Sequence, residues 1–202
     1  MFDPLLRRLV DPVVDPIGGW LDRRGLSADT VTVVGFAVGV VACVALAFQL
    51  YLVALVLIAL NRIADGIDGA IARHHGVTDF GGFLDIVCDF IIYSGFILGF
   101  AIGRPDMALP AAVLIFAFMG TGSSFLAFAI LAARRGITTE ARGNKVIYYV
   151  GGLAEGGETM AVLFAICLFP SLFDWIAYGF AVVCLLTTAS RVAQARLTFD
   201  RS

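Results

Sequence analysis

Apolar residues recur along this 202-residue chain in runs long enough to cross the hydrocarbon core of a membrane, which takes about 20 helical residues. Six hydrophobic segments can be marked: about 29 to 49, 51 to 72, 81 to 103, 107 to 133, 146 to 169 and 171 to 195. We expect each segment to be an α-helix, because a segment in lipid has to satisfy its own backbone hydrogen bonds. The pattern predicts an all-α polytopic membrane protein with six transmembrane helices.

Residues 1–26 follow a different pattern, in which acidic and basic residues are mixed with apolar ones. A signal peptide has an uninterrupted apolar centre, which this stretch lacks. We interpret it as an N-terminal amphipathic helix that lies in the membrane interface. The chain then divides into this interfacial helix, 1–26, and a six-helix membrane domain, 27–202.

Glycines recur at four-residue spacing in two of the segments, at Gly35 and Gly39 and at Gly95, Gly99 and Gly103. This spacing lets helix backbones approach closely. We expect close helix packing there, either within one chain or at a dimer face.

Composition agrees with a membrane environment. The chain is 60% hydrophobic and 15% charged, whereas a soluble domain is about half apolar and a quarter charged. Four cysteines, Cys43, Cys88, Cys167 and Cys184, stand singly in apolar segments without the paired spacing of a zinc or redox site, so we expect buried thiols. The small net charge of −2 argues against nucleic acid as a partner.

Basic residues are distributed unevenly between the two ends of the predicted helices. One side receives only Arg104. The other side receives these residues: Arg7, Arg8, Arg23, Arg24, Arg73, Arg134, Arg135, Arg142, Lys145, Arg196 and Arg201. Because cytoplasmic loops carry the excess of Lys and Arg, we expect both termini, and the loops after the second and fourth segments, to be cytoplasmic.

Four aspartates lie where the second and third segments meet the cytoplasmic side. Asp65 and Asp68 are three residues apart, and Asp85 and Asp89 are four apart, so each pair occupies one helical face. The short connection between the segments makes the two helices antiparallel neighbours. Ionisable groups in a membrane span are costly and mark functional candidates, and we expect these carboxylates to converge just inside the cytoplasmic face.

Four carboxylates this close would repel one another strongly at low dielectric, and a bound cation is the simplest compensation. The ligands are all hard oxygens, which favours Mg²⁺ or Mn²⁺ over zinc. Pairing of the carboxylates with Arg62 and Arg73 is the structural alternative.

His74 and His75 lie in the turn, and we interpret them as solvated interfacial residues.

The run Asp65-Gly-Ile-Asp68-Gly69-Ala-Ile-Ala72-Arg73, followed by Gly81-Gly-Phe-Leu-Asp85-Ile-Val-Cys-Asp89, resembles the signature of the CDP-alcohol phosphotransferase family. That signature reads Asp-x-x-Asp-Gly-x-x-Ala-Arg and then Gly-x-x-x-Asp-x-x-x-Asp, and every specified position is present. The stretches 121–127 and 151–159 are similar to a bacterial inner-membrane branch of the family, the YnjF-like proteins.

The resemblance implies a transferase of phospholipid biosynthesis that displaces CMP from a CDP-linked lipid, normally CDP-diacylglycerol, by attack of an alcohol. It implies two metal ions held by Asp65, Asp68 and Asp85, with Asp89 as the general base that also reaches the second metal. It assigns nucleotide binding to Asp65, Gly69, Ala72, Arg73 and Gly81. It further implies a homodimer in the bacterial inner membrane with its active site at the cytoplasmic face.

The acceptor alcohol is left open by the sequence. Lys145 and Arg191 lie on the cytoplasmic side and can hold an anionic acceptor such as glycerol 3-phosphate, although topology alone also predicts basic residues there. Glu155 and Glu158, inside the fifth segment, favour a cationic alcohol such as choline. Alternatively, both acids pair structurally with Arg191, Arg62 or Lys145.

A non-enzymatic divalent-cation channel or transporter is the alternative function, since acids at a membrane mouth can also select cations. A conduction path would continue polar groups to the far side of the membrane. The outer halves of the predicted helices carry few such groups, which argues for the enzyme.

Overall fold

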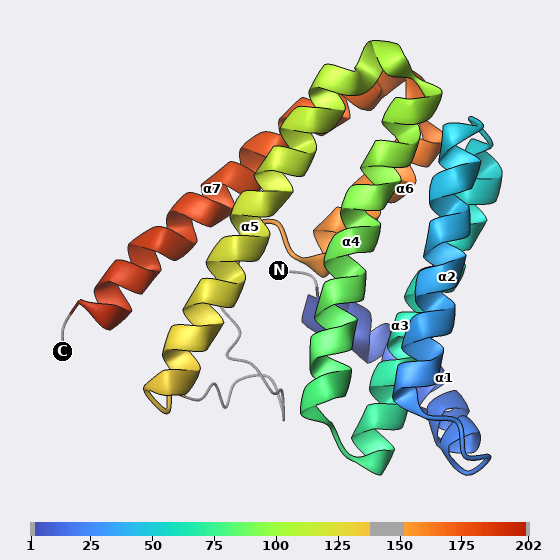
Figure 1. Ribbon diagram of the computed structural model, residues 1–202, viewed down its shortest axis with the longest axis vertical. Coiled ribbons are helices and arrows are strands. Elements are labelled where there is room, and N and C mark those ends of the chain that lie inside the picture. Colours follow the sequence, from blue (N-terminus) through green and yellow to red (C-terminus); the bar gives the residue numbers. More distant parts are fainter. Residues whose placement is uncertain (1–2, 138–151, 201–202) are drawn as a thin grey trace.

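The computed structural model describes residues 3–137 and 152–200, and every regular element in these ranges is helical (Figure 1). The prediction of an all-α protein is confirmed for this part of the chain. The α-helices are α1 Asp3–Asp22, α2 Ala28–Ala47, α3 Tyr51–His75, α4 Asp79–Gly103, α5 Ala108–Arg134, α6 Gly156–Leu168 and α7 Phe173–Phe199. Short 3₁₀ turns, η1 Pro105–Met107 and η3 Pro170–Leu172, precede α5 and α7.

Among the described residues, four helical stretches are long and apolar enough to cross a membrane: Ala28–Ala47, Asp79–Gly103, Pro105–Arg134 and Pro170–Phe199. Helix α3 is 25 residues long but contains Arg62, Asp65, Asp68 and Arg73, which lower its hydropathy. Helix α6 has 13 residues, so it is about 20 Å long, which is less than the roughly 30 Å of a hydrocarbon core. The count of six spans therefore stays a prediction.

The helices form two groups that meet at one end of the molecule (Figure 1). Helix α2 packs against both α3 and α4, and α1 packs against α3. Helices α5 and α7 run side by side and lean away from α4 toward the lower left of the view. Helix α6 lies behind α4 and contacts both α3 and α7.

The hydrophobic core joins the two groups. Phe100 of α4 and Phe173 of α7 are both buried, and their rings stack with centroids 4.0 Å apart and planes inclined by 9°. Offset or parallel aromatic pairs of this kind add to the stabilisation that burial alone provides. This contact lies at the end of α4 that is far from Asp85, so the core anchors the bundle without occupying the carboxylate end.

Glycines allow α2 to approach its neighbours within the chain. A methyl group added to Gly35 would lie 2.9 Å from Cβ of Ala64, and one added to Gly103 would lie 2.7 Å from the carbonyl oxygen of Leu46. Real Cβ atoms do not approach other atoms so closely. The expectation of close helix packing at these glycines is confirmed, and the packing shown is intramolecular.

The segment expected to be helical from 146 to 169 differs from the prediction. Residues 146–151 lie outside the described residues, 152–155 are not helical, and α6 begins only at Gly156. Glu155 precedes the helix as its N-cap, and its side chain and that of Glu158 bond reciprocally to backbone N–H groups. Such a capping box defines a helix start. The expectation that Glu155 lies inside a helix was therefore wrong, because Glu155 is the residue that precedes α6.

Helix α1 lies where the N-terminal amphipathic helix was expected, and ion pairs connect it to the end of α3. Arg73 of α3 donates to Asp15 of α1 at 2.6 Å, and Asp11 lies 3.7 Å from the same nitrogen. Trp20 is 46% exposed, with the Arg24 guanidinium 4.0 Å from its ring centroid. An exposed Trp next to Arg suits a membrane interface, and the interfacial position of α1 stays a prediction.

Candidate metal centre

A tight turn between α3 and α4 brings the motif carboxylates together. Helix α3 ends at His75, and Gly76 follows with a φ of 108°, a conformation that residues with a Cβ rarely adopt. The Thr78 side chain accepts a hydrogen bond from the backbone N–H of Gly81 at 3.0 Å and so caps the start of α4. The two helices then run antiparallel, with their aspartates at the same end of the bundle.

Three carboxylates form a compact cluster. One oxygen each from Asp65, Asp68 and Asp85 lies within 4.8 Å of the other two. Asp68 is 6% exposed, so the cluster is partly withdrawn from water. Three hard oxygen ligands that converge from two helices suit a divalent cation such as Mg²⁺ or Mn²⁺, and this set of donors fits the metal that the sequence predicted.

Helix α2 contributes a residue that the sequence did not single out. The Thr32 hydroxyl donates a hydrogen bond to Oδ2 of Asp68 at 2.6 Å. A bond this short to an ionised oxygen is of the strong, charge-assisted kind. A pocket between the three helices is lined by the following residues: Thr32, Gly35, Phe36, Asn61, Arg62, Asp65, Asp68, Asp85, Cys88, Asp89 and Ile92.

The fourth aspartate, Asp89, lies outside the compact cluster and is paired with Arg62. Arg62 Nη2 donates to Oδ1 of Asp89 at 2.7 Å, and the Tyr93 hydroxyl donates to Oδ2 at 3.1 Å. Arg62 Nη1 donates to the Tyr93 oxygen at 2.7 Å and lies 3.5 Å from an oxygen of Asp65. The pairing with Arg62 that was considered as an alternative is therefore present, at Asp89 and Asp65, beside a cluster of the other carboxylates.

Asn61 connects this ion pair to α2. Its side-chain oxygen accepts from Arg62 Nε at 3.0 Å and from Nη2 at 2.8 Å, and its Nδ2 donates to the carbonyl oxygen of Gly35 at 2.8 Å. Asn61 is 3% exposed. The sequence carried a signal for it, because Asn61 and Arg62 precede Asp65 by about one helical turn.

The positions predicted to bind a nucleotide lie on the same two helices as the cluster. Gly69, Ala72 and Arg73 lie in the last turns of α3, and Gly81 lies in the first turn of α4. A methyl group on Gly81 would lie 2.9 Å from the Thr78 hydroxyl, so the close helix cap requires a glycine. Their role in nucleotide binding stays a prediction.

The predicted acceptor residues have structural contacts where they are described. Arg191 of α7 is 6% exposed, and its Nη1 donates to the carbonyl oxygen of Thr121 on α5 at 2.8 Å. Glu155 accepts from the backbone N–H of Gly152 at 2.9 Å and shares the capping box with Glu158. Lys145 lies outside the described residues.

Comparison with known proteins places the chain among relatives of matching length. It is 47% identical over 199 residues to the Escherichia coli inner membrane protein YnjF, and the match covers 98% of this chain and 97% of that protein. Two crystal structures of the Mycobacterium tuberculosis phosphatidylinositol phosphate synthase share the fold. The structure with CDP-DAG bound matches with a TM-score of 0.74 at 20% identity, covering 92% of this chain and 94% of that one. The structure in complex with manganese and citrate matches with a TM-score of 0.69 at 23% identity, covering 90% and 88%.

The family model of CDP-alcohol phosphatidyltransferases matches residues 26–192, which include the aspartate cluster, Asp89 and every membrane-spanning candidate except the end of α7. The eight signature positions and the geometry of the cluster agree with that match. The chain therefore belongs to the CDP-alcohol phosphatidyltransferase family.

Proposed function

We propose that the protein is a membrane transferase that displaces CMP from a CDP-linked lipid, with CDP-diacylglycerol as the donor, by attack of an alcohol. The observation that carries this proposal is the cluster of Asp65, Asp68 and Asp85, whose oxygens lie within 4.8 Å of one another in a chain of this family. The structural relative that was crystallised with CDP-DAG bound supports the choice of donor. A water-soluble CMP and a lipid product also suit a site at the end of a helix bundle.

The cluster and Asp89 have separate tasks in the proposed reaction. Asp65, Asp68 and Asp85 would hold two divalent cations, Mg²⁺ or Mn²⁺, and these ions would neutralise charge on the donor diphosphate and on the departing CMP. The structure of the relative in complex with manganese supports this type of ion. Asp89 accepts the proton of the acceptor hydroxyl while the new O–P bond forms and the P–O bond to CMP breaks.

For the acceptor we propose an anionic alcohol, with glycerol 3-phosphate as the first candidate. Arg191 is a buried cation on α7, and a guanidinium suits the geometry of a phosphate. The carboxylates of Glu155 and Glu158 accept hydrogen bonds from backbone N–H groups at the start of α6, which gives them a role in helix capping. A cationic alcohol such as choline is therefore the second candidate.

We further propose that the protein lies in the bacterial inner membrane as a homodimer, with both termini and the aspartate cluster facing the cytoplasm. The uneven distribution of basic residues supports this orientation. Similarity to an inner membrane protein supports the location. Residues 1–26 would then lie along the cytoplasmic surface of the membrane domain 27–202.

An acceptor panel tests the proposed function. Purified protein in lipid receives labelled CDP-diacylglycerol together with glycerol 3-phosphate, inositol phosphate, serine or choline, and CMP and lipid products are identified by mass. We expect CMP release with one acceptor, reversible loss of activity on chelation, and inactivity of Asp85→Asn. Asp106→Asn is the matched control, because Asp106 pairs with Arg104 away from the site.

The same preparation also tests the alternative function, a divalent-cation channel. If vesicles containing the protein passed Mg²⁺ down a gradient and no acceptor released CMP, the transferase proposal would be wrong. Release of CMP without Mg²⁺ flux would exclude the channel as the function of the cluster.

A further inference from the structure

Helix α1 presents an apolar stripe on the side that faces away from the bundle. Val13, Ile17 and Trp20 are 63%, 40% and 46% exposed, respectively. Their spacing of four and three residues puts them on one helical face. A continuous exposed apolar stripe, unlike scattered exposed residues, marks a surface that contacts another apolar phase.

A neighbouring side of α1 is fixed to α3, so the direction of the stripe is fixed as well. Val14 is buried, and a methyl group added to Gly66 of α3 would lie 3.5 Å from its side chain. A methyl group added to Gly18 would collide with the side chain of Ala70. Because Gly66 and Ala70 flank Asp68 in the sequence, the stripe lies at the end of the bundle that holds the aspartate cluster.

Packing against α3 also sorts the charges of α1. Residues 1–26 contain four arginines and four aspartates, so their charges cancel in the sequence. In the fold, Asp15 lies 2.6 Å from a guanidinium nitrogen of Arg73, and Asp22 lies 3.1 Å from a ring nitrogen of His75. These acids therefore face basic groups of α3.

Two arginines at the end of α1 have a different position. Arg23 and Arg24 are exposed, and the Arg24 guanidinium lies 4.0 Å from the ring centroid of Trp20. Positive charge thus lies at the edge of the apolar stripe, although residues 1–26 carry no net charge. An apolar face bordered by exposed basic residues is typical of helices that bind anionic membrane surfaces.

The connection to α2 puts the stripe beside a membrane-spanning candidate. Helix α1 ends at Asp22, and α2, which is long and apolar enough to cross a membrane, begins at Ala28. The connection between these two residues can span at most about 20 Å even when fully extended. Trp20 and the two arginines therefore lie close to the point at which α2 would enter the bilayer.

We propose that the outer side of α1 is a docking surface for anionic lipid headgroups. Val13, Ile17 and Trp20 lie at the boundary of the acyl chains, and Arg23 and Arg24 bind lipid phosphates, whose oxygens suit a guanidinium. The preference for anionic lipid arises from the fold, because packing against α3 separates the acids of α1 from these arginines. It rests on the membrane placement in the proposed function and not on the reaction.

Tryptophan quenching tests this surface in the full chain. The chain has two tryptophans, so Trp175→Phe leaves Trp20 as the single reporter. The variant is placed in nanodiscs of equal parts phosphatidylglycerol and phosphatidylcholine, and two samples differ only in which lipid carries brominated acyl chains. A basic residue near an anionic surface contributes about fivefold to affinity. We therefore expect brominated phosphatidylglycerol to quench Trp20 about twofold to fivefold more strongly than brominated phosphatidylcholine.

Charge variants made in the Trp175→Phe background isolate the arginines. With Arg23→Gln and Arg24→Gln combined, the two brominated lipids should quench equally, whereas Arg23→Lys with Arg24→Lys keeps the charge and should keep the preference. Arg104→Gln, which breaks an ion pair at the other end of the bundle, is the matched control and should leave the ratio unchanged. Ile17→Asn weakens the apolar contact and should lower quenching by both lipids without changing their ratio.

Equal quenching of Trp20 by the two lipids in the Trp175→Phe chain would overturn the preference for anionic headgroups. Quenching by neither lipid would overturn the docking surface as a whole. Aqueous acrylamide then identifies the occupant: a quenched Trp20 faces water, and a protected one is covered by a second copy or another protein.

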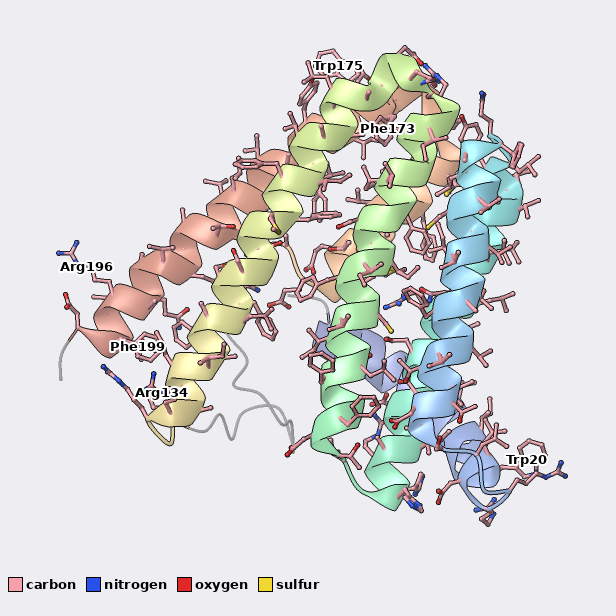
Figure 2. The ribbon with its side chains drawn as sticks, viewed as in Figure 1. Trp20, Arg134, Phe173, Trp175, Arg196 and Phe199 are labelled. Atoms are coloured by element: carbon pink, nitrogen blue, oxygen red, sulfur yellow. The ribbon has the colours of Figure 1, made fainter. Side chains whose placement is uncertain are left out.

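The second tryptophan controls for a general effect of lipid charge. Trp20→Phe leaves Trp175, at the opposite end of the molecule (Figure 2), and its quenching should show no preference for phosphatidylglycerol. An equal preference at Trp175 would show that the effect is not specific to α1 and would contradict the proposal. A chain that released no CMP with any acceptor would still give these quenching ratios, so failure of the reaction and failure of this surface are distinguishable.

Discussion

At the scale of single residues, one hydroxyl group on α2 orients one carboxylate of the aspartate cluster. Thr32 donates to Asp68 at 2.6 Å, and its oxygen also lies 3.1 Å from the carbonyl oxygen of Ala28. A hydroxyl has a single hydrogen, and the shorter, charge-assisted contact with Asp68 is the stronger one. Thr32 therefore holds Asp68, a proposed metal ligand, through one of its two carboxylate oxygens.

The change Thr32→Val tests this support, because it keeps the size and branching of the side chain but removes the hydroxyl. Loss of such an outer partner typically weakens metal binding by about tenfold to a hundredfold, and we expect a Mn²⁺ titration to show a change of this order. Thr32→Ser keeps the hydroxyl and is the control. Binding by Thr32→Val that equals that of wild type would show that Asp68 needs no donor from α2.

Residue spacing predicted the carboxylates well, and it predicted their partners only in part. The i, i+3 spacing places Asp65 and Asp68 on one face of α3, because neighbours on one helix face are set by local geometry. The short connection that makes α3 and α4 antiparallel neighbours was then enough to bring Asp85 to them. Thr32 is 36 positions away from Asp68, and a contact between segments so far apart depends on how helices pack. Tyr93, four residues after Asp89, was within reach of the same spacing argument and was missed.

At the scale of helices, α4 approaches α2 at glycines. Gly99 is buried, and a methyl group added to it would collide with the backbone carbonyl of Cys43. Backbone atoms cannot move aside as a flexible side chain can. The close packing of α2 against α4 therefore depends on this glycine.

Gly99→Val should consequently destabilise the bundle by about 1–3 kcal/mol, the usual cost of overpacking. Unfolding in mixed micelles of increasing denaturing detergent, followed by circular dichroism, measures the change. Gly179→Val is the matched control, since Gly179 also lies inside a helix but has no atom within 4 Å of an added methyl group. Equal destabilisation by both changes would point to helix propensity and not to helix packing.

Helix α1 depends on charged contacts with the end of α3. Arg73 pairs with Asp15 at 2.6 Å and lies 3.7 Å from Asp11, and all three side chains are about two-fifths exposed. Pairs this exposed each contribute less than about 1 kcal/mol. Their loss should free α1 locally and leave the remaining bundle folded.

The double change Asp11→Asn and Asp15→Asn tests this dependence. We expect faster amide hydrogen exchange in α1, measured by mass spectrometry, with little change in the exchange of α4 and α5. Asp106→Asn, which breaks the ion pair with Arg104 at the other end of the bundle, should leave α1 unchanged. Unaltered exchange in α1 after the double change would mean that apolar packing alone holds this helix.

The fifth hydrophobic segment shows the limit of hydropathy as a guide to helices. Because apolar residues lie on both sides of Glu155, hydropathy predicted a helix that begins at about residue 146. The reciprocal capping by Glu155 and Glu158 instead fixes the helix start at Gly156. The pair has the Glu-x-x-Glu spacing of a capping box, although Glu is not a usual N-cap residue. Side-chain capping overrode hydropathy here, and no other described helix start involves two acids in this way.

At the scale of the whole molecule, aromatic and basic residues mark two opposite ends. Figure 2 shows Trp175 at the upper end, Trp20 and Arg134 toward the lower end, and Arg196 at the left edge at about mid-height. Trp175 is 77% exposed, and Trp residues are enriched at both membrane interfaces whereas Arg and Lys gather on the cytoplasmic side. The lower end is also the one at which α3 turns into α4, so Arg134 and the aspartate cluster lie toward the same end of the bundle, which supports the proposed orientation.

Cysteine labelling in vesicles of either orientation tests this arrangement. Asp106→Cys should react with a membrane-impermeant maleimide only in right-side-out vesicles, because the sequence places it with the lone Arg104 outside. His75→Cys and Asp200→Cys should react only in inverted vesicles. The replaced side chains are exposed by 57% at Asp106, 80% at His75 and 72% at Asp200, so each thiol is accessible from its own side. The unsubstituted protein controls for its native thiols. Labelling of His75→Cys in right-side-out vesicles would put the turn beside the aspartates on the outer surface, away from cytoplasmic CMP, and would contradict both the orientation and the proposed reaction.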